Sequence, residues 1–408
     1  MKIDSRILEL SEEVEKAIQK EFLKIEQIRE KNFLKVLDAF QKANISDFHF
    51  RDTSGYGLAD PGRDKLEEVY KNIFHTELAL VRPQIVSGTH AIAIALFGLL
   101  RPGETLLYLT GEPYETGEAI IGIRKTTGSL AEYGIKFDIT NLFEKVEEEK
   151  IKKASVGVIQ RSGGYSYRKA FTISEIETMI KKAREVNPDI VIMTDNCYGE
   201  FVEEMEPTDV GSDVVVGSLI KNMGGGIAPT GGYIVGKKNA IEKIEAMLTA
   251  PGTGREIGPM LNLTRLFLQG VFFAPLVVSN ALKGAVFAAK LFSELGYPVK
   301  PAFNEVRGDI VQAIELKSPE KLVKFAQAVQ NVSPIDYDAE ITPSPLAGYG
   351  NEILMAAGTF VQGSSIELSA DAPMKPPYVI YLQGGIYYEH SKLASMYAAS
   401  QIGTPEGD

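Results

Sequence analysis

The chain has 408 residues, of which 44% are hydrophobic and 24% charged, and its formal net charge is −11. This length exceeds what one compact core usually holds and indicates one large domain with smaller parts. The acidic balance, without a block of clustered lysines and arginines, argues against a nucleic-acid-binding protein. The single cysteine, Cys197, excludes an intrachain disulfide and is typical of a reducing compartment. The N-terminus has no signal-peptide core, and the longest apolar run, residues 91–100, is too short to span a bilayer. We therefore expect a cytoplasmic protein without a membrane or nucleic-acid partner.

The first half of the chain predicts helices followed by a parallel sheet. Apolar residues at helical spacing over residues 5–43 predict two amphipathic helices. Residues 51–63 are rich in glycine, proline and aspartate and indicate an irregular loop. From there to about residue 240, short apolar runs alternate with helical patterns, as in a mostly parallel sheet covered on both faces. The predicted strands are 105–109, 155–160, 190–194, 213–217 and 232–235, and the predicted helices are 63–74, 89–100, 114–122 and 174–186, the last with a capping box from Ser174 to Glu177.

The last third of the chain has a different order of elements. A long helix is predicted over about residues 260–295, then a strand at 309–316, a helix at 319–329, and strands near 365–368 and 378–383. This order indicates a smaller α+β domain. The sequence therefore predicts an N-terminal helical segment (1–50), a large α/β domain (51–285) and a C-terminal α+β domain (286–408).

Polar residues near the ends of the predicted strands are the first candidates for a site, because ligands of open α/β sheets bind beyond the carboxyl ends of the strands. Ser87, Gly88 and Thr89 precede an apolar helix, where free N–H groups and the helix dipole favour an anion, although such residues also cap helices for structural reasons. Asp195 ends a buried strand, where a carboxylate needs a partner. A pyridinium N–H, a metal and an arginine are possible partners, and a plain helix cap is the structural alternative.

Ser218 and Lys221 follow another predicted strand and precede the three glycines 224–226. Most lysines are solvated surface residues. A lysine between a buried strand and a triglycine loop is instead expected to be partly desolvated, with a lowered pKa, and so to act as a nucleophile. The four histidines lack metal-ligand spacing, so no metal site is predicted. Residues 252–254 lack the third glycine of a dinucleotide-binding fingerprint.

The order of these features resembles the fold-type I pyridoxal-phosphate (PLP) enzymes, and within them the Cys/Met-metabolism group of cystathionine and methionine lyases. Four stretches are similar to the methionine gamma-lyase-related proteins, which are also described as cystathionine beta-lyase-like or aluminium-resistance proteins: SGTHAIAIALFGLLRPGETLL, VIQRSGGYSYR, TDNCYGEFVE and SLIKNMGGGIAPTGGYIVG. The resemblance covers most of residues 50–300. It implies the fold-type I PLP-dependent transferase fold, with a seven-stranded, mostly parallel sheet, and pyridoxal 5'-phosphate as cofactor.

The resemblance also implies roles for the cofactor end of the site. Ser87, Gly88 and Thr89 would hold the cofactor phosphate through backbone N–H groups, and Ser218 would add a hydroxyl. Tyr56 resembles the segment that, in the lyases, reaches the phosphate in a neighbouring subunit, which implies a homodimer or homotetramer.

The same comparison implies three residues for the chemistry. Tyr114 would stack on the pyridine ring and assist proton transfer. Asp195 would pair with the ring nitrogen, and Lys221 would carry the cofactor as a Schiff base.

The chain departs from the lyase pattern at two phosphate ligands. The lyases carry arginine where this chain has Leu58, and threonine where it has Ile220. The phosphate site must then be built partly otherwise, and Arg63 and residues 252–254 are candidates.

The substrate carboxylate presents a second departure, because no arginine follows Arg307. Most fold-type I enzymes bind this carboxylate through an arginine of the C-terminal domain. Arg161, at the end of a predicted strand, is the best-placed replacement, since a guanidinium binds a carboxylate in bidentate fashion. A surface or phosphate-facing Arg161 is the alternative, in which case Lys375 or backbone donors would hold the carboxylate.

The resemblance favours a PLP-dependent carbon–sulfur lyase that acts on a sulfur-containing amino acid by β- or γ-elimination. A PLP aminotransferase, a cysteine desulfurase-like enzyme and a non-catalytic PLP-binding protein remain alternatives.

Overall fold

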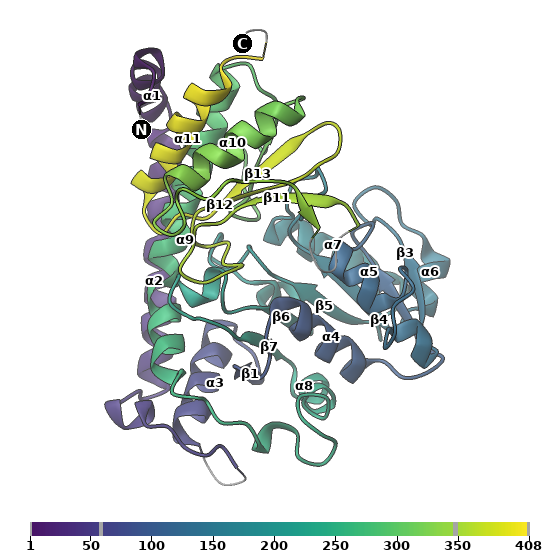
Figure 1. Cartoon of the computed structure of the whole chain (residues 1–408). Helices are drawn as coiled ribbons and strands as arrows, with labels where there is room; N and C mark the ends of the chain where they lie inside the picture. The colour runs from purple at the N-terminus through teal and green to yellow at the C-terminus, as the bar shows by residue number, and fades with distance from the viewer. Residues whose placement is uncertain (1, 57–59, 346–349, 406–408) are drawn as a thin grey trace.

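A seven-stranded sheet forms the centre of the larger part of the protein, as seen in a computed structural model that describes residues 2–56, 60–345 and 350–405 (Figure 1). The strand order is β1-β7-β6-β5-β4-β2-β3. Strand β7 is antiparallel to both of its neighbours, and the other pairs are parallel. Strands β4 and β6 are buried along their whole length, as expected for parallel strands covered on both faces. The strands are β1 Leu78–Arg82, β2 Thr105–Tyr108, β3 Lys136–Ile139, β4 Val156–Gln160, β5 Val191–Asp195, β6 Val214–Ser218 and β7 Gly232–Gly236.

Helices cover both faces of this sheet because successive side chains of each strand point to opposite sides. One face packs on α4 and α8 in a single apolar cluster. The other face packs on α7 at one end of the sheet and on α3 and α9 at the other. The helices of this part are α3 Pro61–Ile73, α4 Gly88–Leu99, α5 Glu115–Ile121, α6 Glu148–Lys153, α7 Ile173–Val186 and α8 Lys238–Glu245.

The helix α9, Thr264–Glu294, runs along the side of the molecule and joins its parts (Figure 1). The two N-terminal helices, α1 Ser5–Ala17 and α2 Gln19–Lys42, pack on α9 and share its apolar cluster. By length and composition α9 could cross a membrane, but 72% of its most apolar window is buried inside the protein. A helix that is apolar on most sides and buried in this way is typical of a protein core.

The C-terminal part is a six-stranded antiparallel sheet with the order β10-β11-β12-β13-β9-β8. Helices α10 and α11 pack together and, with α9, bury the apolar side of this sheet in one cluster. The elements are β8 Val299–Lys300, β9 Gln312–Glu315, α10 Pro319–Asn331, β10 Ser344–Pro345, β11 Glu352–Ala356, β12 Ser369–Pro373, β13 Val379–Gln383 and α11 Tyr388–Ile402. Figure 1 shows strands β11 to β13 lying across the edge of the larger sheet.

The five strands predicted from the first half of the sequence and the two N-terminal helices are confirmed. Strands β1 and β3 were not predicted. The strand predicted near residues 365–368 is wrong, because β12 begins only at Ser369. The predicted capping box is also wrong by two residues: Thr172 accepts from the N–H of Glu175, whose carboxylate accepts from the N–H of Thr172. The proposed domain boundary at residue 285 falls inside the continuous helix α9.

Candidate active site

A cavity of about 450 Å³ lies between the carboxyl ends of strands β4, β5 and β6 and one face of the C-terminal sheet. Its lining brings together residues that are far apart in the sequence. The predicted site residues in this lining are Ser87, Gly88, Thr89, Tyr114, Asp195, Ser218 and Lys221. The cavity therefore lies at the sheet edge where ligands of α/β proteins bind. Seven of the site residues predicted from the sequence line it.

The N-terminus of α4 forms one end of the cavity. Ser87 is the extended N-cap residue, and its Oγ accepts a hydrogen bond from the N–H of His90 at 3.0 Å. The first N–H groups of a helix have no partner within it, so those of Gly88 and Thr89 remain for a ligand. A Cβ on Gly88 would lie 3.1 Å from Cys197 Sγ and 3.2 Å from Ser218 Cβ. This end of the cavity is thus a close-packed backbone cradle that suits an anion.

Asp195 ends strand β5, Lys221 follows the neighbouring strand β6, and the two interact electrostatically. Asp195 Oδ1 accepts from the N–H of Cys197 at 3.1 Å. Burial raises the pKa of Asp195, and the positive charge of Lys221 and the hydrogen bonds with Cys197 offset this rise only in part. The carboxylate is therefore in a position where a cationic partner would stabilise its ionised form.

Lys221 lies over the ring of Tyr198, with Nζ 3.9 Å from the ring centroid. The sequence predicted a lowered pKa for this lysine, and the structure contradicts that. Burial alone would lower the pKa of Lys221, but the combined effect of Cys197, Tyr198 and Asp195 outweighs burial and raises it. Lys221 thus interacts electrostatically with Asp195 in the cavity, in addition to its contact with the Tyr198 ring.

Tyr114 is fixed at the side of the cavity by contacts from the end of β4 and from the loop that follows it. Its N–H donates to Gln160 Oε1 at 2.8 Å. Gly164 has a φ of +56°, and a Cβ there would lie 2.4 Å from the Tyr114 ring. Tyr165 packs edge-on against the same ring, with centroids 5.7 Å apart. The aromatic face predicted for stacking thus borders the cavity in a defined position.

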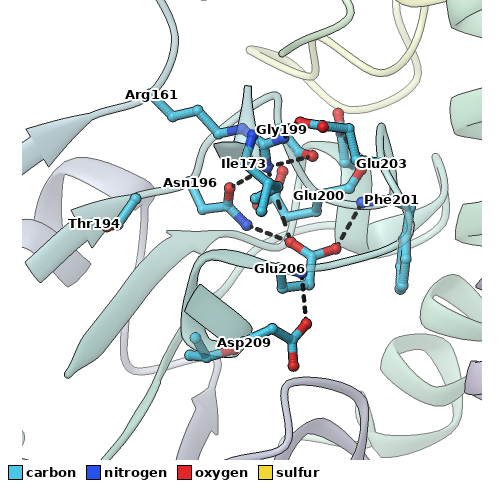
Figure 2. A network of polar contacts seen from close by, with 12 residues as sticks. Arg161, Ile173, Thr194, Asn196, Gly199, Glu200, Phe201, Glu203, Glu206 and Asp209 are labelled. Carbon is cyan, nitrogen blue, oxygen red and sulfur yellow. Dashed lines mark hydrogen bonds and ion pairs between the residues drawn. The ribbon is translucent and has the colours of Figure 1, made fainter. Parts of the chain in front are cut away.

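Arg161 does not belong to the cavity lining that the structure describes. Its side chain is fully buried, and its guanidinium donates to Phe171 O, Asn196 Oδ1, Gly199 O and Glu203 Oε1 at 2.8–3.2 Å. Figure 2 shows the contacts with Asn196 and Gly199. These bonds occupy four of the five N–H donors of the guanidinium. The predicted role of Arg161 in binding a substrate carboxylate therefore does not fit its position.

Arg161 instead belongs to a polar network that holds the loop after Asp195 (Figure 2). Its backbone N–H donates to Asp195 O at 3.1 Å. Asn196, which accepts from the guanidinium, donates to Glu206 Oε2 at 2.9 Å, and the other oxygen of Glu206 accepts from the N–H of Phe201. The loop from 196 to 206 is thus fastened on both sides of Asp195.

The remaining phosphate candidates lie elsewhere. Tyr56 is 74% exposed and forms an isolated β-bridge with Ile257. Tyr56, Arg63 and residues 252–254 are all absent from the lining of the described cavity. Leu58 lies outside the described residues. Ile220 does line the cavity, so this chain has an apolar side chain at the position where the lyases carry threonine. Among the described lining residues, Lys221 is the one lysine or arginine.

The wall contributed by the C-terminal sheet was missed by the sequence reasoning. It includes Asp371, whose Oδ2 accepts from Gln383 Nε2 at 2.7 Å and from the Tyr165 hydroxyl at 3.3 Å. Burial raises the pKa of Asp371 to about 7, against the effect of these hydrogen bonds and of Lys221. The only signal in the sequence was an aspartate inside an otherwise small and apolar segment, and the misplaced strand at 365–368 hid it.

Comparison of the chain with known proteins shows the family to which it belongs. The family model described as methionine gamma-lyase matches residues 7–403. The chain belongs to the methionine gamma-lyase family. The resemblance stated from the sequence is thereby confirmed. The uncharacterised protein YnbB of Bacillus subtilis is 48% identical to this chain over 401 residues, and the match covers 96% of this chain and 95% of that protein.

Solved structures agree with this placement. A structure described as a carbon–sulfur lyase involved in aluminium resistance, from Clostridium novyi, is 45% identical and has a TM-score of 0.93, covering 98% of this chain and 96% of the other. The pyridoxal-5'-phosphate-dependent protein YhfS of Escherichia coli shares the fold at 18% identity, with a TM-score of 0.60 and coverage of 92% and 97%. The predicted fold class, a fold-type I PLP-dependent α/β protein, is confirmed, and the chain is a PLP-dependent lyase-like member of this family.

Replacing Arg161 tests its structural role. Arg161→Met should lower the free energy of unfolding by about 3 kcal/mol, because it leaves buried acceptors and Glu203 without their cationic partner. Lys42→Met, which removes an exposed pair with Asp38, should change it by less than about 1 kcal/mol. Urea denaturation of both variants measures the difference. An Arg161→Met protein with unaltered stability would contradict a structural role.

The cradle at α4 yields a second prediction. Gly88→Ala should weaken PLP binding by about tenfold or more, since its methyl group must displace Cys197 or Ser218 at the proposed phosphate end. Absorbance titration of the cofactor-free protein with PLP gives the dissociation constant. Gly350→Ala, at an exposed glycine with open space around it, is the matched control. Equal PLP affinity in both variants would place the phosphate elsewhere.

Proposed function

We propose that this protein is a PLP-dependent carbon–sulfur lyase that acts on a sulfur-containing amino acid by β- or γ-elimination. The observation that supports this most directly is that Lys221 and Asp195 interact electrostatically in one cavity that also contains the anion cradle of α4. The names of several structural relatives, including the Clostridium novyi lyase, point to the same class of reaction.

The residues of the cavity fit the chemical groups of PLP. A phosphate suits the N–H groups of Gly88 and Thr89, with the Ser218 hydroxyl in the same end of the lining. Asp195 suits a protonated ring nitrogen, because its buried carboxylate needs a cationic partner. Lys221 suits the aldehyde as a Schiff-base amine. When bound, PLP supplies the electron sink for negative charge at the substrate Cα.

The chain itself supplies proton transfer and electrostatic control. Asp195, held by the network around Arg161, would keep the ring nitrogen protonated in a site shielded from bulk water. Lys221, once its amine is free, would remove the proton from the substrate Cα and return a proton to the departing sulfur.

We also propose that the protein is a cytoplasmic homo-oligomer in which Tyr56 of one chain approaches the phosphate end of a neighbouring site. Its high exposure and its position outside the cavity of its own chain agree with a role toward a second chain. A dimer would supply phosphate contacts that replace the missing lyase ligands.

Product analysis distinguishes the proposed lyase from the other PLP activities. The PLP-loaded protein is incubated with cystathionine, methionine and cysteine in turn. Release of a keto acid, ammonia and a thiol supports elimination. Amino transfer to an added keto acid would indicate an aminotransferase instead, and a cofactor spectrum without turnover of any substrate would indicate a binding protein.

Lys221→Ala should abolish the visible absorbance of the covalently bound cofactor and lower turnover by at least about 100-fold, because it removes both the anchor and the base. Lys238→Ala, an exposed lysine, should leave both unchanged. Absorbance spectra and a thiol-release assay measure the two effects. A Lys221→Ala protein that still holds the cofactor covalently would assign the anchor to another lysine.

Asp195→Asn should retain the fold but lose about two orders of magnitude in turnover, since a neutral amide cannot stabilise a protonated ring nitrogen by charge. Circular dichroism checks the fold and the same thiol-release assay gives the rate. Near-normal turnover would remove Asp195 from the proposed mechanism.

A further inference from the structure

Three polar atoms on the C-terminal wall of the cavity are buried and have no hydrogen-bond partner among the residues that the structure describes. They are Ser365 Oγ, Ser369 Oγ and Asp371 Oδ1. Their residues are only 4%, 3% and 7% exposed, and all three line the cavity. Buried polar groups are normally paired, since an unmade hydrogen bond costs about 1–3 kcal/mol, so three such atoms on one wall indicate a site for a ligand.

The fold turns this wall toward the cavity. Ser369 and Asp371 are two residues apart on β12, so their side chains share one face of the sheet. Their partners in the register are Gln383 on β13 for Ser369 and Met355 on β11 for Asp371, and both partners line the same cavity. Ser369 and Asp371 therefore lie on one continuous sheet face, and Ser365 lies in the segment that leads into β12.

The hydrogen bonds of Asp371 leave one oxygen for a ligand. Gln383 Nε2 and the Tyr165 hydroxyl both donate to Oδ2 and fix the orientation of the carboxylate. No donor reaches Oδ1 within the described residues. An ionised carboxylate has acceptors only, so the group that complements Oδ1 must be a hydrogen-bond donor.

The balance of charge favours a cationic donor. The described lining contains two carboxylates, Asp195 and Asp371, and Lys221 as its single lysine or arginine. Under the proposed function, Lys221 and Asp195 are engaged with the cofactor, which leaves Asp371 without a counter-charge. A serine hydroxyl can accept as well as donate, so Ser365 and Ser369 suit the further N–H groups of an ammonium.

We propose that Asp371, Ser365 and Ser369 form a subsite for a second ammonium group of the substrate, distinct from the α-amino group that reacts at Lys221. The inference rests on the proposed function and narrows its substrate class. The preferred substrates are thioether amino acids that carry another amino group beyond their sulfur. Simple sulfur amino acids such as methionine or cysteine lack that group.

Binding of an ammonium group at this subsite should depend on pH. Burial raises the pKa of Asp371 to about 7, and the groups that face it are Tyr165, Gln383 and Lys221, with Tyr381 opposite it across the β12–β13 pair. A proton and an ammonium compete for the same carboxylate. Binding of the second ammonium should therefore weaken as the pH falls below about 7 and strengthen above it.

The test compares two ligands that differ by one amino group, L-cystathionine and S-(3-carboxypropyl)-L-cysteine. Binding to the PLP-loaded protein is followed by the change in cofactor absorbance on mixing, which needs no turnover. The native protein should bind cystathionine at least about tenfold more tightly. Asp371→Asn, which keeps the shape but removes the charge, should weaken cystathionine binding by the same factor and leave the other ligand unchanged.

Two further variants keep the test decisive. Ser369→Ala should weaken cystathionine binding selectively, by a smaller factor, and serves if Asp371→Asn does not fold. Met355→Leu, an apolar change on the same wall, should affect both ligands equally. Equal affinities of the native protein for the two ligands, or an equal loss for both in Asp371→Asn, would overturn the subsite. If the subsite is overturned but either ligand still releases a keto acid, the proposed lyase function holds. If no sulfur amino acid releases a keto acid, the lyase function itself is contradicted.

Discussion

The electrostatic interaction between Asp195, at the end of β5, and Lys221, just beyond the end of β6, is the interaction on which the rest of the site depends. Asp195 ends β5 and Lys221 follows the adjacent parallel strand β6, so the sheet brings the two residues to the same edge. Each modifies the other: the lysine offsets part of the burial penalty on the carboxylate, and the carboxylate helps to keep the lysine protonated. Opposite charges that are removed from water seldom increase the stability of a protein, because desolvation opposes the Coulomb attraction. The presence of Asp195 and Lys221 in a cavity is better explained by a chemical role.

The surrounding structure fixes this pair from two sides. Below it, the guanidinium of Arg161 and the carboxylate of Glu206 hold the loop that follows Asp195 through buried hydrogen bonds. Beside it, the glycine at the start of α4 lets the helix approach Cys197 and Ser218 closely. The site residues therefore lie on strand ends and a helix terminus whose positions are determined by the packed core. Such support is what a pre-organised active site requires.

The sequence predicted the half of the site built on parallel strands and missed the half built on the C-terminal sheet. Asp195 and Lys221 follow short, buried apolar runs, and the carboxyl ends of parallel strands meet at one edge, so their proximity follows from topology. Strand β3 escaped prediction because it is an edge strand with exposed residues and no apolar run. Asp371 escaped because only tertiary packing brings β12 across that edge. Arg161 was misassigned because strand order fixes where a residue lies along the sheet but not which partners its side chain reaches.

The most direct test of this account is borohydride reduction of the purified, PLP-loaded protein, followed by proteolysis and mass spectrometry of the peptides. Reduction makes a Schiff-base linkage permanent, so the modified residue can be located. The account predicts that the pyridoxyl group is found on the peptide containing Lys221 and that the visible absorbance of the native protein disappears on reduction. Modification of a different lysine, or a protein that binds PLP without any reducible linkage, would contradict it.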